Sequence, residues 1–365
     1  MSYLSPLLNR SGAVAAGGLD AGVASHYGDP NREQRLLAGY LGKPGSAVVD
    51  LSHRGVVTVT GPDRLSWLNT LSSQALTNLA PNVGTELLLL TIQGRIEFDA
   101  RVVDDGGTAW LIVETAEAAP LAQWLNSMKF MLRVEIADVS ADWAVAGSVT
   151  EVPGWEKYLV WVDPWPNIGA GGYSYAALPE ADHPGLERPW REYLIPATEF
   201  VEAVGSLPLA GVWAAEALRL AAWRPRRGAE TDEKTIPHEL DLMRTAVHLA
   251  KGCYKGQETI ARVHNLGHPP RRLVFLQLDG SLHTLPAAGS EVLLEDRVVG
   301  KVTSVAQHFE MGPIALAVIK RSVDPAAVLM VDDSGEKYPA NQEIIVATDA
   351  GQVLGRQTGF LRPPR

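Results

Sequence analysis

The chain has 365 residues, a length that predicts two or three domains. Hydrophobic residues make up 46% of it and charged residues 20%, a composition that is typical of folded proteins and excludes a largely disordered chain. The 42 acidic residues outnumber the 32 Lys and Arg residues, and the net charge of -10 argues against nucleic acid as the main partner.

Cysteine content and hydropathy indicate the compartment. One cysteine, Cys253, excludes an internal disulfide, and no Cys/His cluster has the spacing of a zinc site. Residues 1–24 lack the apolar core of a secretory signal. The longest uncharged stretch, residues 164–179, is interrupted by Gly and Pro and cannot form a spanning helix. We therefore expect a cytoplasmic protein that has no membrane partner.

Gly and Pro divide the first half of the chain into short elements. Residues 1–30, rich in Gly, Ala and Ser, predict an N-terminal arm. The β-branched run 56–60 predicts a strand, followed by a helix with Pro62 in its first turn. Further patterns predict strands over 87–92, 96–102 and 110–113, a helix over 116–129 and a strand through 134–139.

The strands over 87–92 and 96–102 form a predicted β-hairpin with a polar face. Glu97, Asp99 and Arg101 alternate with apolar residues, so their side chains share one face of the sheet. We expect that face to be solvated.

The second half begins with a Trp-rich loop region and ends in strands. The loop region ends near Pro196 and predicts a small α+β subdomain. A helix is predicted over 212–223, with Trp213, Ala217 and Leu220 on one face and Glu216, Arg219 and Trp223 on another. Strands over 273–278, 291–294, 298–305 and 314–319 predict an antiparallel barrel or sandwich.

The segment from Lys251 to Arg262 surrounds the single cysteine. Cys253 precedes a predicted helix over 256–264, and the nearby Lys251 and Lys255 would favour its thiolate. The alternative is that Cys253 is a small buried hydrophobic residue and that Gln257 and Glu258 only cap the helix. His264 and His268 are four residues apart, but the helix is expected to end between them, so we predict no metal site.

This segment resembles the signature of the YgfZ family, folate-binding relatives of the glycine cleavage T-protein. The resemblance extends through residues 49–63, 216–240 and 299–304. The matching signature positions are Lys251, Gly252, Cys253, Tyr254, Gly256, Gln257 and Glu258.

The resemblance implies an α+β fold of three parts around a central folate-binding hole, with a C-terminal antiparallel β-barrel. The implied units are the arm over 1–30, a discontinuous folate-binding α+β domain over 31–130 plus 205–270, an inserted α+β subdomain over 131–204, and the barrel over 271–365.

The resemblance also implies tetrahydrofolate, or a folate derivative, as the cofactor, with Cys253 and Asp99 as catalytic residues. Asp99 aligns with the segment that supplies the catalytic aspartate of T-proteins, and Arg219 with their folate arginine. Trp223 would add an aromatic wall, and the arginines at 224, 226 and 227 are candidates for the glutamate tail. The alternatives are a solvated Asp99, an Arg219 that only bridges Glu216, and an arginine cluster at a solvated helix end.

The YgfZ resemblance implies a tetrahydrofolate-binding accessory factor for the assembly or repair of iron–sulfur clusters. Its partners would be folate and, transiently, client or assembly proteins, because one thiolate cannot supply the four ligands of a cluster. The alternative is a folate-dependent one-carbon transferase, such as an aminomethyltransferase or demethylase, with Asp99 acting on the folate nitrogen. T-proteins usually carry two adjacent acids where this chain has Phe98-Asp99, and they lack the Cys motif. A third interpretation is an interaction scaffold that binds no pterin.

Overall fold

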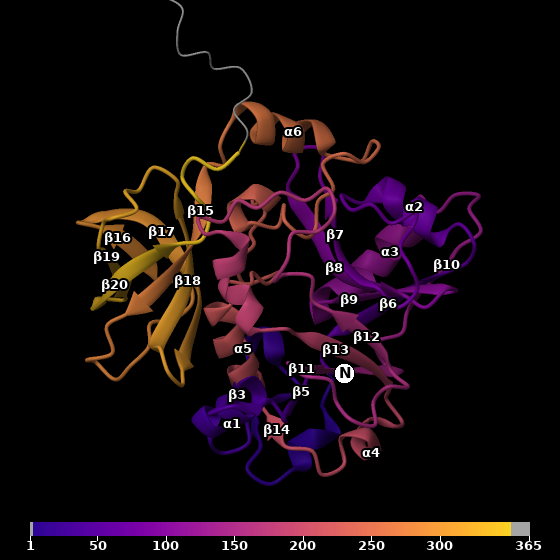
Figure 1. The fold of residues 1–365 in the computed structure, drawn as a ribbon, viewed down its shortest axis with the longest axis horizontal. Coiled ribbons are helices and arrows are strands. Elements are labelled where there is room, and N and C mark those ends of the chain that lie inside the picture. The colour runs from indigo at the N-terminus through magenta and orange to yellow at the C-terminus, as the bar shows by residue number, and fades with distance from the viewer. Residues whose placement is uncertain (1–2, 352–365) are drawn as a thin grey trace, which may run out of the picture.

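The computed structural model describes residues 3–351 and combines two five-stranded sheets with a barrel (Figure 1). The first sheet has the strand order β10-β6-β9-β8-β7 and is antiparallel throughout. Its strands are β6 (Gly55–Thr60), β7 (Gly84–Leu90), β8 (Ile96–Asp104), β9 (Thr108–Val113) and β10 (Glu135–Asp138).

Two helices cover one face of this sheet, α2 (Arg64–Leu71) and α3 (Ala118–Met128). Leu68 on α2 and Leu121 and Leu125 on α3 are buried against the strands, which accounts for the apolar spacing of both helices. Asp63 is the N-cap of α2, so Pro62 lies before the helix. The prediction that Pro62 lies in the first turn of the helix is therefore wrong.

The second sheet has the order β12-β13-β11-β5-β14 and draws strands from separate parts of the chain. The strands β11 (Trp143–Ser148), β12 (Leu159–Val162) and β13 (Arg191–Pro196) come from the Trp-rich region, whereas β5 (Val48–Asp50) and β14 (Leu209–Ala210) flank it. One sheet therefore crosses the boundaries expected at 131 and 204. The short helix α4 (Phe200–Val204) follows β13.

The C-terminal part is a closed six-stranded barrel with the order β15-β18-β17-β16-β19-β20, which confirms the predicted barrel. It begins at Arg271, and the end of the expected unit, 352–365, lies outside the described residues. Its strands are β15 (Arg271–Leu278), β16 (Glu291–Leu294), β17 (Arg297–His308), β18 (Gly312–Lys320), β19 (Leu329–Asp333) and β20 (Glu336–Ile344).

Helix α5 (Val212–Ala221) lies between the second sheet and the barrel (Figure 1). Ala217 and Leu220 are fully buried on it, but Trp213, expected on the same face, is 55% exposed. The helix ends at Ala221, and Trp223 has a positive φ of 58°, so it does not continue the face of Glu216 and Arg219 as predicted.

The N-terminal arm packs onto the body of the molecule. It contains β1 (Val14–Ala15) and β2 (Ala24–His26), followed by α1 (Pro30–Ala38) and the small hairpin β3 (Gly39–Tyr40) and β4 (Lys43–Pro44). Gly211 allows β2 to approach the start of α5, because a Cβ there would lie 2.1 Å from the carbonyl oxygen of Ser25.

Helix α6 (Gln257–Leu266) packs on the tip of the β7–β8 hairpin (Figure 1). Short 3₁₀ helices complete the connections at Pro6–Asn9, Gly18–Asp20, Thr115–Glu117, Glu180–Asp182, Pro184–Glu187 and Pro237–Leu240. Within residues 3–351, no helix combines the length and the apolar character needed to cross a bilayer.

Candidate functional site

The polar face of the β7–β8 hairpin is covered by the segment that follows α5. Arg224 and Arg226 in this segment are buried, at 5% and 3% exposure, and both pair with carboxylates of the first sheet. The face that was expected to be solvated is partly covered, because Glu97, Asp99 and Arg101 on it are half-buried. The interpretation of the arginines as a solvated helix end is wrong. We call residues 224–227 the arginine segment.

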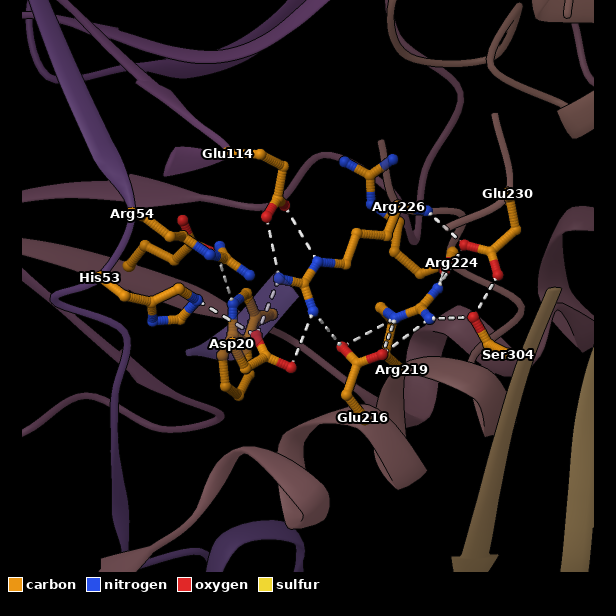
Figure 2. A network of polar contacts seen from close by, with 12 residues as sticks. Asp20, His53, Arg54, Glu114, Glu216, Arg219, Arg224, Arg226, Glu230 and Ser304 are labelled. Carbon is orange, nitrogen blue, oxygen red and sulfur yellow. Dashed lines mark hydrogen bonds and ion pairs between the residues drawn. The ribbon is translucent and has the colours of Figure 1, made fainter. Parts of the chain in front are cut away.

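Arg226 is the centre of a buried charge network (Figure 2). Its guanidinium donates to both carboxylate oxygens of Glu114, at 3.0 and 2.8 Å, and also reaches Asp20 at 2.8 Å and Glu216 at 3.3 Å. Burial alone would raise the pKa of Glu114, but the charge and hydrogen bonds of Arg226 outweigh it and lower this pKa to about 2. Arg226 thereby joins the N-terminal arm, the first sheet and α5.

Arg219 forms the second node of the network and joins α5 to the barrel (Figure 2). It donates to Glu216 at 2.8 Å, Glu230 at 2.8 Å, Ser304 on β17 at 2.9 Å and the carbonyl oxygen of Arg224 at 2.7 Å. These bonds and a further one from Nε to Glu216 occupy all its N–H groups. Arg219 does bridge Glu216, and its assignment to folate stays a prediction.

Asp99 lies beside this network without a hydrogen-bond partner among the described residues. It shares the hairpin face with Arg101 on β8 and with Glu86 on β7, which is diagonal to it in the sheet register. Burial, and then the charge of Glu86, raise its pKa to about 8, although Arg224 and Arg101 oppose the shift. A carboxyl group that keeps its proton near neutral pH can act as an acid.

Little space remains at the centre of the molecule. The cavity there has a volume of about 20 Å³, enough for roughly one water molecule. Four buried side-chain atoms of the residues that line it lack hydrogen-bond partners: Arg54 Nε, Arg188 Nε, Glu192 Oε2 and Arg224 Nη1. These donors and this acceptor suit a polar ring such as a pterin, but ligand pockets usually measure about 300–1,000 Å³. Tetrahydrofolate therefore does not fit the cavity in this arrangement.

Trp223 lies outside this cavity. It is buried, with its ring edge-on to His183 at a centroid distance of 5.7 Å. Arg227 bonds Glu117 at 2.7 Å and the carbonyl oxygen of Glu97 at 3.1 Å. The structure thus groups Asp99, Arg219 and the arginine segment, and leaves Trp223 to one side.

The signature segment holds Cys253 in a loop before α6, and most of its residues bind the fold. The ammonium of Lys251 donates hydrogen bonds to the carbonyl oxygens of Asn69, Ser72 and Gln74, at the C-terminal end of α2 and just beyond it. Burial lowers the pKa of Lys251 to about 8. Tyr254 is buried in the core.

The remaining signature residues fix the start of α6. Gly256 has a φ of +88°, and a Cβ there would lie 2.5 Å from the carbonyl oxygen of Thr91. Gln257 bonds the carbonyl oxygen of Lys251 at 3.4 Å. Glu258 pairs with Arg262 at the surface.

Cys253 itself is exposed, so the interpretation as a buried hydrophobic residue is wrong. Lys251 directs its ammonium to backbone carbonyls, and Lys255 pairs with Glu97 at 3.1 Å. Both lysines are thus occupied by other groups. Cys253 is the signature side chain left free of such contacts, which makes it available to a partner.

Sequence reasoning missed most of the acids of the network. Glu114 follows the strand β9 directly, and Glu230, Glu86 and Asp20 come from loops and strands far apart in the chain. The available signal was the arginine segment itself, because buried arginines require buried acids.

The described residues 3–351 contain no group of three or more His, Cys, Asp or Glu side chains that could hold a metal ion. His264 bonds the hydroxyl of Tyr175 at 2.9 Å, and α6 ends at Leu266, between the two histidines, as expected.

Comparisons with known proteins agree with the fold. Residues 271–343 match the family of the glycine cleavage T-protein C-terminal barrel domain. The fold resembles the crystal structure of glycine cleavage system aminomethyltransferase T from Bartonella henselae, with a TM-score of 0.73, 15% identity and coverage of 95% of this chain and 97% of that one.

The curated relatives of this chain include aminomethyltransferases and iron–sulfur cluster assembly factors. An aminomethyltransferase from Nostoc sp. is 29% identical over 316 residues, which cover 81% of this chain and 82% of the relative. The mitochondrial iron–sulfur cluster assembly factor IBA57 homolog of Mycosarcoma maydis is 26% identical over 243 residues, or 61% of this chain and 55% of the relative. These likenesses support the T-protein superfamily for this chain.

Removal of the Arg226 charge should strongly destabilise the folded protein. Arg226→Met leaves Glu114, Asp20 and Glu216 without a shared cation, and we expect the free energy of unfolding to fall by about 3–5 kcal/mol. Urea denaturation measures it. The control Arg262→Met removes a side chain that is 68% exposed and pairs with Glu258, so its effect should stay below about 1 kcal/mol. Equal losses in both variants would contradict the role of Arg226.

Two glycines of the signature segment should respond differently to alanine. Gly256→Ala places a Cβ against the hairpin tip at a positive φ, so we expect a loss of about 1–3 kcal/mol and faster alkylation of Cys253. A Cβ at Gly252 would meet no atom within 4 Å, so Gly252→Ala should change neither. The same loss in both variants would show that the close approach at Gly256 does not matter.

Asp99 should make stability fall with rising pH. The folded protein keeps the Asp99 proton up to about pH 8, whereas an unfolded chain releases it near pH 3.8. The folded state therefore binds more protons over this range, so wild-type stability should decrease relative to Asp99→Asn as the pH rises through it.

Asp63 supplies the opposite control. Hydrogen bonds from Arg133 lower the pKa of Asp63, so its contribution should instead be lost as the pH falls. Denaturation at several pH values measures the difference in stability between wild type and Asp99→Asn, and in the same way the difference between wild type and Asp63→Asn. A pH-independent difference between wild type and Asp99→Asn would contradict the raised pKa.

Proposed function

We propose that this protein is a tetrahydrofolate-binding accessory factor, of the YgfZ type, that assists the assembly or repair of iron–sulfur clusters in client enzymes. The observation that carries the proposal is the way in which the fold presents Cys253. Lys251 binds the carbonyl groups at the end of α2, Tyr254 is buried in the core, and Gly256 fixes the start of α6. The thiol of Cys253 itself is exposed. A rigid loop that presents one thiol suits a contact made with another protein.

The chemistry of clusters fits a shared and transient contact. Iron–sulfur clusters are usually held by four cysteine thiolates, and this chain has one cysteine. Cys253 can supply one ligand or one exchangeable thiolate while the client supplies the others. The relative in Mycosarcoma maydis, an assembly factor for such clusters, supports this choice.

A folate-dependent one-carbon transferase is the second candidate. It is favoured by Asp99, whose raised pKa provides an acid at neutral pH, and by the aminomethyltransferase of Nostoc sp.. The central cavity of about 20 Å³ opposes it, because it leaves no room for a substrate among the residues of the network. Turnover of methylamine-type donors with tetrahydrofolate, abolished in Asp99→Asn, would favour this candidate.

Tetrahydrofolate enters the proposal through the resemblance of the sequence to folate-binding proteins. Asp99, Arg219 and the unpartnered atoms of Arg224 and Glu192 are the groups that would contact its polar ring. The arginine segment would have to move before the ring could enter. We further propose a cytoplasmic location, because the cysteine content suits a reducing compartment.

The role of Cys253 can be tested in cells that lack the gene. We expect the wild-type chain to restore the activity of cluster-dependent enzymes, and Cys253→Ala and Cys253→Ser to leave it near the level of the empty vector. Lys255→Ala is the matched control, because it alters the same loop but keeps the thiol, and it should restore activity. Immunoblots and thermal melts verify that each variant is present and folded. Full rescue by Cys253→Ala would overturn the role of the thiol.

A further inference from the structure

A groove of about 560 Å³ lies at the surface beside the Cys253 loop. One side of it is formed by the chain between α2 and β7, and the other by the stretch from His248 to Gly252. Gly252 directly precedes Cys253, and a Cβ at Gly252 would meet no atom within 4 Å. The Cys253 thiol is exposed, and consecutive Cα atoms are about 3.8 Å apart. The groove therefore ends within one residue of the thiol.

The two sides of the groove are joined by hydrogen bonds. The backbone N–H of His248 donates to the carbonyl oxygen of Ser73 at 2.9 Å. The hydroxyl of Ser73 donates to the carbonyl oxygen of Ala246 at 2.6 Å, and the ammonium of Lys251 donates to that of Gln74 at 3.0 Å. The groove is thus part of the folded structure, and an occupant does not have to order its walls on binding.

The walls of the groove are apolar and offer no free charge. Among the described residues that line it, Lys251 and His248 are the titratable ones. The ammonium of Lys251 is bound by backbone carbonyl oxygens, so it does not face an occupant as a free cation. The apolar side chains of the lining are Ala75, Leu79, Ala80 and Val83. A charged group that entered the groove would lose water without gaining a partner, so the groove favours an uncharged, apolar occupant.

A turn at Thr77 and Asn78 adds backbone donors to one side of the groove. The N–H of Leu76 is used by the side chain of Asn69 at 2.9 Å, and the N–H of Leu79 by the carbonyl oxygen of Leu76 at 3.0 Å. Within residues 3–351, the N–H groups of Thr77 and Asn78 donate no hydrogen bond, and both residues are exposed in the lining. An extended polypeptide brings carbonyl oxygens that accept from such groups. The groove therefore suits a stretch of chain better than an apolar small molecule.

We propose that this groove binds an uncharged, extended segment of the protein that shares a cluster with Cys253, an inference that rests on the proposed function. A protein that supplies the remaining cluster ligands must place its own chain beside the thiol. The groove holds the residues next to one of the partner's cysteines, with apolar side chains against Leu79 and Val83 and carbonyl oxygens toward Thr77 and Asn78. The groove thus selects the partner, and the thiol makes the exchangeable contact.

Thiol exchange with model peptides on the purified full chain tests the proposal. The probe is the acetylated and amidated peptide Leu-Val-Cys-Val-Leu, whose cysteine is capped by thionitrobenzoate, and two matched probes replace both leucines by glutamate or by lysine. The Cys253 thiolate attacks the peptide sulfur, a mixed disulfide forms and the coloured thionitrobenzoate anion leaves. Each rate is divided by the rate with N-acetylcysteine, which removes the intrinsic reactivity of the peptide. We expect the leucine peptide to react about tenfold faster than both charged peptides.

Two valine variants show whether the groove causes this preference. Val83→Glu places a charge in the apolar wall, so it should remove the preference for the leucine peptide. Val201→Glu is the matched control, because Val201 lies on α4 outside the groove and is 45% exposed, against 48% for Val83. It should keep the preference. Thermal melts verify that both variants fold.

Four results would overturn the proposal: equal rates for the three peptides, rates that follow only the attraction of the peptide charge to a chain of net charge -10, a preference that Val83→Glu leaves unchanged, or no reaction at Cys253. The rescue experiment in cells separates this outcome from that of the proposed function. If Cys253→Ala restores activity in cells, the proposed function fails whatever the peptides show. If Cys253 is required in cells and the peptides show no preference, the groove fails alone.

Discussion

The pairing of Arg226 with Glu114, Asp20 and Glu216 is the interaction on which the arrangement of the molecule depends. Each of these charges is largely buried, and an unpaired buried ion costs several kcal/mol. The partners lie on the N-terminal arm, the first sheet and α5, so the charges are satisfied together only when these parts are correctly placed. Arg219 extends the same constraint to the barrel through Glu230 and Ser304. Hydrophobic packing stabilises each part, and the charges specify how the parts meet.

This constraint also explains the environment of Asp99. The arginines that cover the hairpin face direct hydrogen bonds to Glu114, Glu86 and Asp163, and none of the bonds in the described residues reaches Asp99. An acid without a partner in a buried site favours its neutral form. Opening the centre for a ligand would separate ion pairs that hold the parts together. Binding at the centre and stability are therefore opposed in this protein.

Much of the fold follows from local sequence pattern, because the first hairpin, the helices and most barrel strands show clear periodicity. The last hairpin was missed because β20 buries few large side chains. Its signal was the Ser334-Gly335 pair, whose positive φ angles match a tight hairpin turn. The charge network was not predictable from pattern, because its acids are distant in sequence. Cys253 could be identified from the sequence because the residues of its signature are contiguous. The structural roles of these residues could not be predicted, because they depend on contacts with distant parts of the chain.

Both candidate centres are supported by the β7–β8 hairpin. Its tip carries α6 and the Cys253 loop, and its face carries Asp99. They meet at Glu97, whose carboxylate pairs with Lys255 of the loop and whose carbonyl oxygen accepts a hydrogen bond from Arg227. A hairpin held from both sides cannot easily shift at one end alone. The Cys253 loop and the arginine segment therefore contact the same strand, β8, which also carries Asp99.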